Sequence, residues 1–504
     1  MKITEVILGG PGAGKTEALL KLVEDQLEKG AQPEAIAFVT FTRAAAKEAK
    51  DRACAKFKLD PKQLPWFRTL HSVAFEALGL RRDQVMQRSH WRDLGELLGL
   101  KFGRSPIAPD EGPLLPGDGE GDQGRYLIQL ANATQRPLRE IWQASGAGIG
   151  WERLEQLAGS LDSFKRDMGL IDFSDMLRLF LERGAPVSVQ AAFIDEAQDL
   201  TAEQWRAARL AFRDTPLVYI GGDDDQAIYK WSGADLGQFL TLDARRRVLP
   251  VSRRLPQKVF TVAEQIVSQI GGRYPKIWHP KPEAGTVSYL GAADLVDLSV
   301  PGDWLLLARH RYQLLALGTV ARGQGVPYSI SGRSAVDPDT VTAIRAWETL
   351  RKGTAITAEH ANLIQPFLEN RDPMHTPQFH TVGDLGTTPM LVRAVGWPLD
   401  QVWHDAFIEL PAQEREFYRS CLRRGEDLIG APRIRVSTIH GAKGAEADNV
   451  LVLPDMSRRT WAGYESAPDA EHRVFYVGVT RTKKNLHLVY PSSSKAYAWP
   501  EQKS

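Results

Sequence analysis

The sequence reads GGPGAGKT from Gly9 to Thr16. An apolar run, ITEVIL, precedes this stretch, and a segment with helical periodicity, EALLKLVEDQLEKG, follows it. A strand, a glycine-rich loop and a helix in this order are typical of a phosphate-binding loop, because backbone N–H groups and the positive end of the helix dipole converge there. A glycine-rich turn before an ordinary helix would not need every fixed position of the pattern, and all of them are present. The stretch therefore predicts a nucleoside triphosphate site.

Each part of this loop has an expected task in binding the triphosphate. The backbone is expected to cradle the phosphates, and the Lys15 ammonium to reach the β- and γ-phosphates. The Thr16 hydroxyl would ligate Mg²⁺. The residues that we expect to bind the nucleotide in this stretch are Gly10, Pro11, Gly12, Ala13, Gly14, Lys15 and Thr16.

The composition indicates a soluble protein of several domains. The chain has 504 residues, of which 43% are hydrophobic and 25% charged, and roughly 150 residues per domain suggests three or four domains. No apolar run approaches the roughly 18 residues of a membrane span, and a strand follows Lys2 where a signal peptide would have its apolar segment. Cys54 and Cys421 are too far apart for a zinc motif. The formal charge of +1 neither supports nor excludes nucleic acid as a partner.

A short apolar strand ends in two adjacent carboxylates within AAFIDEAQDLT, from Ala191 to Thr201. In an enzyme with a phosphate loop, such a strand end supplies a Mg²⁺ ligand and a group that orients the attacking water. We assign the metal to Asp195 and the water to Glu196. Without the phosphate loop upstream, a solvated acidic turn would be the better interpretation.

Aromatic side chains follow two other predicted strand ends. PLVYIGG leads into DDDQAIYKWSGAD, where Gln226 could present an amide to the γ-phosphate, and where Tyr229 and Trp231 follow. Phe41 lies between two threonines at the end of an earlier strand and is followed by Arg43. An exposed aromatic at such a place is a stacking platform for a nucleobase. For Phe41, filling the core is an equally good interpretation.

The chain as a whole resembles the UvrD/Rep group of superfamily 1 DNA helicases. The resemblance rests on eight motifs that occur in the family's order. They are GGPGAGKT, VTFTRAAAKEAKDR, RTLHSVAF, IDEAQD, GGDDDQAIYKWSGAD, LPVSRRLPQKVF, RVSTIHGAKGAEADNVLVL and HRVFYVGVTRTKKNLHLVY. The helical segment after the third motif, the segment between the sixth and seventh, and the last dozen residues are not matched.

The resemblance implies a fold and further functional residues. The fold is α/β, with two RecA-like P-loop domains that have parallel sheets and each carry a mainly α-helical insertion. Gln226 would sense the γ-phosphate, Arg254 and Arg481 would act as arginine fingers from the second lobe, and Glu446 would contact the ribose. The residues implied to bind single-stranded DNA are Phe41, Arg43, Thr69, His71, Tyr229, Trp231, Thr438 and His440.

Three features depart from the family pattern. Only eight residues precede Gly9, which leaves no room for the glutamine motif that reads adenine, so selectivity for adenine is open. Arg253 stands where the family has an aromatic that stacks on the base; its guanidinium either stacks in that place or is solvated. Arg43 stands where the family commonly has Asn and adds positive charge beside the strand track.

The pattern of elements divides the chain into five parts. We expect the loop from Ser105 to Arg125 to be mobile and the tail to be disordered. The predicted parts are a first RecA-like domain (1–78 and 185–248), its helical insertion (79–184), a second RecA-like domain (249–331 and 433–490), its accessory insertion (332–432) and a tail (491–504).

From the resemblance we predict an ATP-dependent DNA helicase or translocase that moves 3′-to-5′ on single-stranded DNA, with ATP and Mg²⁺ as cofactors. Its expected partners are single-stranded DNA and junctions of single- and double-stranded DNA, in replication or repair. We expect no association with a membrane, and we expect a monomer. The expected location is the cytoplasm, in the host cell if a phage encodes the chain. The alternative is a DNA-stimulated ATPase that translocates or removes bound proteins without separating strands. A regulatory P-loop switch without nucleic acid is disfavoured by the arginines and aromatics.

Overall fold

The computed structural model describes residues 1–103, 119–369, 379 and 387–500. The chain divides into two compact units. The first unit consists of Met1–Leu255, Val267–Pro282 and Pro468–Tyr476. The second unit consists of Pro256–Ile266, Glu283–Ala467 and Val477–Ser504.

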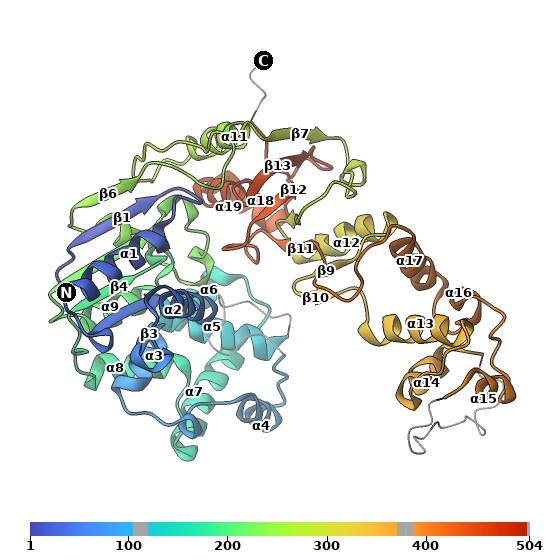
Figure 1. Ribbon diagram of the computed structural model, residues 1–504. Helices are drawn as coiled ribbons and strands as arrows, with labels where there is room; N and C mark the ends of the chain where they lie inside the picture. Colours follow the sequence, from blue (N-terminus) through green and yellow to red (C-terminus); the bar gives the residue numbers. More distant parts are fainter. Residues whose placement is uncertain (104–118, 370–378, 380–386, 501–504) are drawn as a thin grey trace. The chain divides into compact units, whose positions relative to one another are not determined.

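The first unit is built on a six-stranded sheet in which every neighbouring pair of strands is parallel (Figure 1). The strand order is β3-β2-β4-β5-β1-β6. The strands are β1 (Glu5–Gly9), β2 (Ile36–Thr40), β3 (Trp66–Thr69), β4 (Ala191–Ile194), β5 (Leu217–Gly222) and β6 (Arg246–Leu249). The helices that belong to this layer are α1 (Lys15–Glu28), α2 (Arg43–Phe57), α3 (Leu70–Ala77), α9 (Ala202–Ala211) and α10 (Leu236–Leu240).

Two inner strands of this sheet, β2 and β4, are buried along their whole length. β2 reads IAFVT and β4 reads AAFI, and all of these residues are buried. Continuous apolar runs are expected for parallel strands that are covered on both faces. Helix α1 places Leu19, Leu20 and Val23 against the sheet, in one core with Ile7 and Phe38. The 3.6-residue period of α1 puts these side chains on one side of the helix.

The register of the sheet brings the ends of the functional strands together. Leu8 is paired with Gly222, and Gly9 with Leu249. Ile194 is paired with Ile220, two residues before β5 ends. Because the strands are parallel, the segments that follow β1, β4, β5 and β6 all leave the sheet at the same edge.

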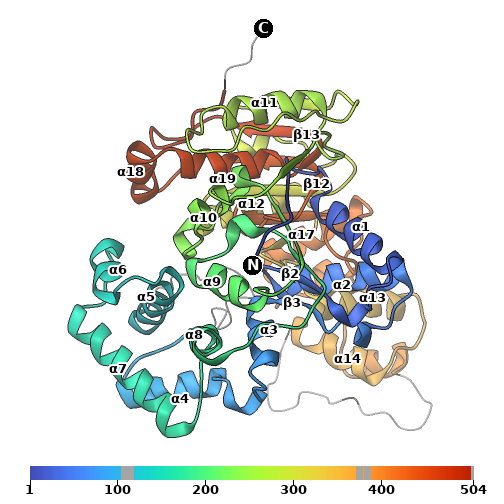
Figure 2. The same cartoon turned by 90° about the vertical axis from the view of Figure 1, so that its left-hand side faces the viewer.

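Among the described residues between α3 and β4, five α-helices form the insertion of the first unit, seen as a group in Figure 2. They are α4 (Arg88–Leu98), α5 (Glu120–Thr134), α6 (Leu138–Ser145), α7 (Trp151–Met168) and α8 (Phe173–Arg183). The expectation of a mobile loop as far as Arg125 is wrong for its last residues, because α5 already begins at Glu120. Asp122 accepts from the Gly103 N–H at 2.8 Å and pairs with Arg125 at 3.0 Å. Residues 104–118 of the expected loop lie outside the described part.

The second unit contains a seven-stranded sheet with the order β10-β9-β11-β8-β12-β13-β7. Only the edge pair of β9 and β10 is antiparallel among these pairings. The strands are β7 (Thr286–Leu290), β8 (Trp304–Ala308), β9 (Tyr328–Ile330), β10 (Arg333–Ser334), β11 (Ile434–Thr438), β12 (Ala447–Val452) and β13 (Thr482–Val489). The helices outside the insertion are α11 (Gln257–Val267), α12 (Leu314–Gly323) and α18 (Arg458–Ser466). Helix α19 (Asp469–Val479) begins in the first unit and ends in the second.

The insertion of the second unit lies between β10 and β11, and the regular elements among its described residues are helices. Its centre is Trp347, which is fully buried and stacks on Trp397 with ring centroids 6.0 Å apart. Phe407 packs edge-on against the same ring. The helices are α13 (Pro338–Arg351), α14 (Ala358–Ile364), α15 (Pro389–Ala394), α16 (Trp403–Ala406) and α17 (Ala412–Arg423).

Two mainly parallel sheets, each in a unit with a helical insertion, confirm the predicted fold class. The two compact units alternate along the chain more often than the two predicted RecA-like domains do. Residues 267–282 and 468–476 belong to the first unit, although the sequence assigned both to the second domain. Among the described helices, none has the length and apolar character needed to cross a bilayer.

The tail is ordered as far as Pro500, so the expectation of disorder from residue 491 is wrong. Tyr497 is fully buried, and its N–H donates to the Pro454 carbonyl at 2.9 Å. The Trp499 indole donates to the Val489 carbonyl at 2.7 Å. These two aromatic rings supply the apolar area that the Ser- and Pro-rich composition of the tail does not suggest. Residues 501–504 lie outside the described part.

We predict that Tyr497→Ala destabilises the second unit. Removing a fully buried aromatic side chain costs about 3 kcal/mol, because the lost burial is accompanied by a cavity. Thermal unfolding measured by calorimetry should show the lower midpoint. Lys495→Ala, which changes a half-buried neighbour in the same tail, is the control and should leave the midpoint within about 1 °C of the wild type. An unchanged midpoint for Tyr497→Ala would contradict the packed tail.

Candidate nucleotide and nucleic-acid site

The loop after β1 has the backbone conformation that phosphate binding requires. Gly12 and Gly14 have φ angles of 73° and 82°, in the left-handed region that glycine adopts without strain. The Lys15 ammonium donates to the Gly9 carbonyl at 3.0 Å across the loop. The Thr16 hydroxyl donates to the Asp195 carboxylate at 2.5 Å. The two predicted magnesium ligands therefore lie side by side, although 179 residues separate them.

The segment after β6 packs directly onto this loop. The Ser252 hydroxyl donates to the Pro11 carbonyl at 2.6 Å, and the Arg253 N–H donates to the Gly12 carbonyl at 2.9 Å. A Cβ on Gly12 would lie 2.4 Å from the Cβ of Arg254, so no larger residue fits there. The conformation of the loop is thus stabilised by the segment after β6 as well as by its own glycines.

An aromatic ring that the sequence did not single out also covers the loop. Trp278 is 3% exposed, and a Cβ on Gly10 would lie 2.7 Å from its ring. The second glycine of the stretch is therefore needed for the close approach of this indole. The sequence gives little indication of this contact, because Trp278 follows Gly10 by more than 260 residues and belongs to no phosphate-binding pattern.

The two arginines after β6 lie in the same compact unit as the phosphate loop. This differs from the prediction that Arg254 comes from the second lobe, because residues 250–255 pack on the loop before the chain leaves for α11. Arg254 is half-buried and its N–H donates to the Ser252 hydroxyl at 3.2 Å. Arg253 has an exposed side chain. Contact of either guanidinium with nucleotide stays a prediction.

The acidic pair after β4 has two different environments. Asp195 is 3% exposed, and burial together with the neighbouring Glu196 raises its pKa to about 6. Glu196 is half-buried and has φ 53° and ψ 38°, a left-handed conformation that is uncommon for a residue with a side chain. Backbone strain of this kind gathers at functional sites. The oxygen ligands of Thr16 and Asp195 suit Mg²⁺.

A buried glutamine links the acidic pair to the segment after β5. Gln198 is fully buried; its amide nitrogen donates to the Glu196 carboxylate, and its oxygen accepts from the Asp223 N–H at 3.0 Å. Gln226 is 6% exposed and donates to the Asp223 carboxylate at 2.7 Å. A Cβ on Gly222 would lie 2.7 Å from the Gln198 oxygen, so the glycine that ends β5 makes room for this link.

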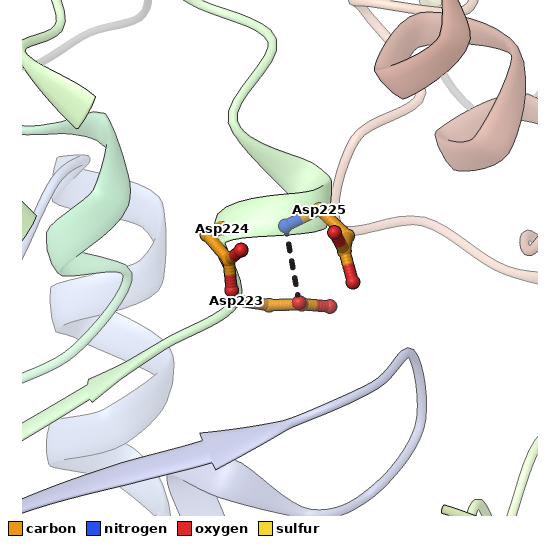
Figure 3. Close-up of side chains that lie close together, drawn as sticks. All are labelled: Asp223, Asp224 and Asp225. Carbon is orange, nitrogen blue, oxygen red and sulfur yellow. Dashed lines mark hydrogen bonds between the residues drawn. The ribbon is translucent and has the colours of Figure 1, made fainter. Parts of the chain in front are cut away.

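Three consecutive aspartates, Asp223, Asp224 and Asp225, gather their carboxylates after β5 (Figure 3). Their oxygens lie within 4.8 Å of one another, as in a cation site. The protein supplies the cation itself, because the Lys276 ammonium lies 3.1 Å from Asp223 and 2.9 Å from Asp225 and also contacts Asp224. Burial opposes the charge on Lys276, but the three aspartates hold its pKa above the ordinary value. We therefore assign no metal to this cluster.

The aromatic residues predicted to stack on nucleobases form one group in the first unit. Phe41 and Tyr229 are stacked with ring centroids 5.7 Å apart, and Trp231 meets Tyr229 edge-on at 6.3 Å. Phe41 is only 8% exposed, which corrects the expectation of an exposed platform. Its ring packs on Tyr229, so the core interpretation describes it in this structure. Trp231 is half-buried.

Thr69 and His71 lie at the start of α3 and have structural contacts. The Thr69 hydroxyl caps the helix by accepting from the Ser72 N–H at 3.3 Å. His71 is 4% exposed and meets the Phe173 ring edge-on. The exposed Arg43 places its guanidinium 5.8 Å from the centre of the same ring.

A cavity of about 970 Å³ opens beside these residues in the first unit. Its lining combines cationic and aromatic side chains, a combination suited to a nucleic-acid strand. The lining includes Arg43, Arg68, His71, Phe75, Arg82, Arg88 and Phe173.

The remaining predicted residues lie in the second unit. Thr438 ends β11 and its hydroxyl accepts from the Gly441 N–H at 3.0 Å, and His440 is half-buried nearby. Glu446 is exposed just before β12. Arg481 is 1% exposed, and its guanidinium donates to the Val477 carbonyl at 2.9 Å. Their contacts with nucleotide or DNA stay predictions from the resemblance.

The fold and the loop define a class of protein. A parallel sheet whose first strand leads into a phosphate loop, with Thr16 and Asp195 joined at the sheet edge, is the nucleotide-binding arrangement of a P-loop nucleoside triphosphatase. Residues 2–246 match the family model described as the UvrD/REP helicase N-terminal domain, and residues 418–493 match the UvrD-like helicase C-terminal domain. Together these matches cover more than half of the chain. The chain belongs to the UvrD/Rep family of DNA helicases, and the predicted family and enzyme class are confirmed.

Three relatives illustrate how far the similarity extends. The ATP-dependent DNA helicase Rep of Escherichia coli is 27% identical and is aligned over 98% of this chain and 89% of its own. The probable DNA helicase II homolog of Rickettsia felis is 22% identical over 98% of this chain and 91% of its own. The ATP-dependent DNA helicase PcrA of Leuconostoc citreum is 25% identical over 57% of this chain, and that match spans only 40% of PcrA.

We predict that Glu203→Gln stabilises the protein selectively at high pH. Glu203 is 4% exposed in a small cavity shared with Phe41 and His71, and burial together with Asp172 raises its pKa to about 8. The pKa of Glu203 in the folded protein lies above the ordinary value of 4.5. The stability that the bound proton contributes is therefore complete below pH 4.5, and it is lost as pH rises through the pKa of the folded protein.

Melting curves at pH 6 and pH 9 test this prediction. The gain in melting temperature of the variant over the wild type should be larger at pH 9 than at pH 6, because its neutral amide cannot ionise. Glu155→Gln changes an exposed glutamate and should show no such pH dependence. A shift of equal size at both pH values for Glu203→Gln would contradict the raised pKa.

Proposed function

We propose that this chain is an ATP-dependent DNA helicase that translocates 3′-to-5′ along single-stranded DNA and acts at junctions with double-stranded DNA. The observation that carries the proposal is the Thr16–Asp195 contact beside the Lys15 loop, inside a chain of the UvrD/Rep family. The direction of movement rests on the resemblance. The mixed cationic and aromatic cavity beside Arg43 supports a nucleic-acid strand as the second ligand.

The residues of the first unit divide the work of hydrolysis. The loop N–H groups and the Lys15 ammonium bind the phosphates, and Thr16 and Asp195 would hold Mg²⁺, which neutralises phosphate charge when it is bound. Glu196 orients the attacking water, and Gln226 presents its amide to the γ-phosphate. Arg254, whose Cβ packs against Gly12, would supply positive charge to the transferred phosphoryl group. Arg481 is assigned to the same transition state from the resemblance alone.

The aromatic group would couple this chemistry to movement along DNA. Tyr229 and Trp231 follow Gln226 by three and five residues in the same segment. A change at the γ-phosphate that moves Gln226 would therefore also move the aromatic pair. Stacking with a nucleobase contributes about 1–3 kcal/mol and tolerates any base, which suits a motor that steps along an arbitrary sequence.

The first test measures ATP hydrolysis with and without single-stranded DNA. We expect DNA to stimulate turnover, and Lys15→Ala to lower kcat by at least about a hundredfold because a charge that stabilises the transition state is lost. Lys484→Ala removes an exposed lysine paired with Asp448 and should retain wild-type turnover. Hydrolysis that does not respond to DNA would contradict the proposal. Repeating the assay with GTP measures how strongly the site selects adenine.

Strand separation is tested with partial duplexes that carry one single-stranded tail. We expect displacement when the tail has a free 3′ end and little when it has a free 5′ end. ATP hydrolysis without displacement of either substrate would favour a translocase that removes bound proteins. Preference for the 5′ tail would contradict the proposed direction.

A further inference from the structure

Lys276 is an unusual lysine in the first unit because it is completely enclosed by acidic groups. Its side chain and those of Asp223, Asp224 and Asp225 have no exposed area. A buried ion pair is a costly arrangement, and removal of one partner leaves an uncompensated charge. Such a cluster needs a reason beyond stability, since apolar side chains of similar volume would pack there at a lower desolvation cost.

Neighbouring groups complete the cluster and fix its geometry. Arg273 binds the Asp225 carboxylate through two hydrogen bonds, of 2.8 Å and 2.7 Å. The Tyr274 N–H donates to Asp224 at 2.7 Å. Bidentate pairing of this kind sets direction as well as distance. Residues 273–276 are thus seated on the aspartates by three separate contacts.

The cluster is continuous with the predicted hydrolysis residues. Asp223 accepts from Lys276 on one carboxylate oxygen and from the Gln226 amide on the other. Its own N–H donates to Gln198, whose amide nitrogen donates to Glu196. A backbone N–H can only donate and a carboxylate can only accept, so the Gln198 amide has one possible orientation. Glu196 and Gln226 are therefore held by one hydrogen-bonded network that passes through Asp223.

We propose that Lys276 and Gln198 are positioning residues for ATP hydrolysis, which hold Gln226 and Glu196 through Asp223 in the arrangement needed for attack on the γ-phosphate. The inference rests on the proposed function. Lys276 keeps the Asp223 carboxylate in place, and Asp223 orders the Gln226 amide. The side-chain hydrogen bonds and ion pairs of Lys276 and Gln198 go to acidic groups and to the Asp223 N–H. Loss of either should therefore lower kcat and spare nucleotide affinity.

The variant that tests this is Asp224→Asn/Lys276→Met. The pair removes one negative and one positive charge, so the cluster keeps its charge balance, and the amide oxygen introduced in place of the Asp224 carboxylate can still accept from the Tyr274 N–H. Asp223 keeps its bond to Gln226, and Asp225 keeps Arg273. Asp224→Asn alone is the matched control, because it retains Lys276 on Asp223. Circular dichroism and a melting curve establish that each variant is folded.

We expect the double variant to lower kcat at least about tenfold, while the dissociation constant of a fluorescent ATP analogue changes less than about twofold. In a Gln226→Ala background the same pair should lower kcat by less than about twofold further, because residues that act through one another are not additive. Asp224→Asn/Lys276→Gln, which restores an N–H donor to Asp223, should recover most of the activity.

Two results would overturn the inference. One is an unchanged kcat in the double variant, and the other is a fold-reduction of kcat by the double variant that is as large in the Gln226→Ala background as in the wild type. If the Met variant does not fold, Gln198→Met is measured in its place, because it cuts the network at the Glu196 end. It should lower kcat at least about tenfold with an unchanged dissociation constant, and an unchanged kcat would overturn the inference. A wild-type chain without ATPase activity would instead refute the proposed function, so the two failures are distinguishable.

Discussion

Parallel pairing of β1, β5 and β4 is the constraint on which the rest of the first unit depends. It brings the phosphate loop, the acidic pair and the aspartate segment to one edge of the sheet, although they are separated by up to about two hundred residues of sequence. The Thr16 hydroxyl reaches Asp195 because of this pairing. A one-residue slip between β4 and β5 would turn the side chains of the strand to the other face and separate these groups.

The same edge of the sheet also gathers buried charged side chains, and ionic contacts therefore contribute to the packing of the chain there. The contacts of residues 273–278 within the first unit include the ion pairs of Lys276 and Arg273 and the packing of Trp278 against the phosphate loop. Arg473 adds a further contact by donating to the Asp224 carbonyl at 2.9 Å. Directional ionic contacts specify one arrangement more narrowly than apolar packing does. The segments that return to the first unit are thus fixed in position relative to the aspartates.

Much of this site can be predicted from sequence where the relevant residues are neighbours. The loop, the carboxylate pair at Asp195 and the amide at Gln226 each stand in a local pattern with a physical reason for its spacing. Lys276 and Trp278 do not, because their function arises from contacts with residues more than fifty positions away. Burial is the other quantity that local patterns do not supply. Phe41 is enclosed because Tyr229 stacks on it, and no property of its own segment indicates that partner.

The strained and charged features of the site depend on one another. Glu196 adopts a left-handed backbone conformation that costs of order 1–3 kcal/mol, and it persists only where surrounding contacts impose it. Two such contacts are its own N–H to the Asp195 carboxylate at 2.9 Å and the Gln198 amide on its side chain. Gln198 is in turn oriented by Asp223, whose carboxylate is held by Lys276. The ionic cluster therefore helps to impose the conformation of Glu196 through Gln198. The unfavourable desolvation of Lys276 is thus offset by a contribution to the geometry of the site.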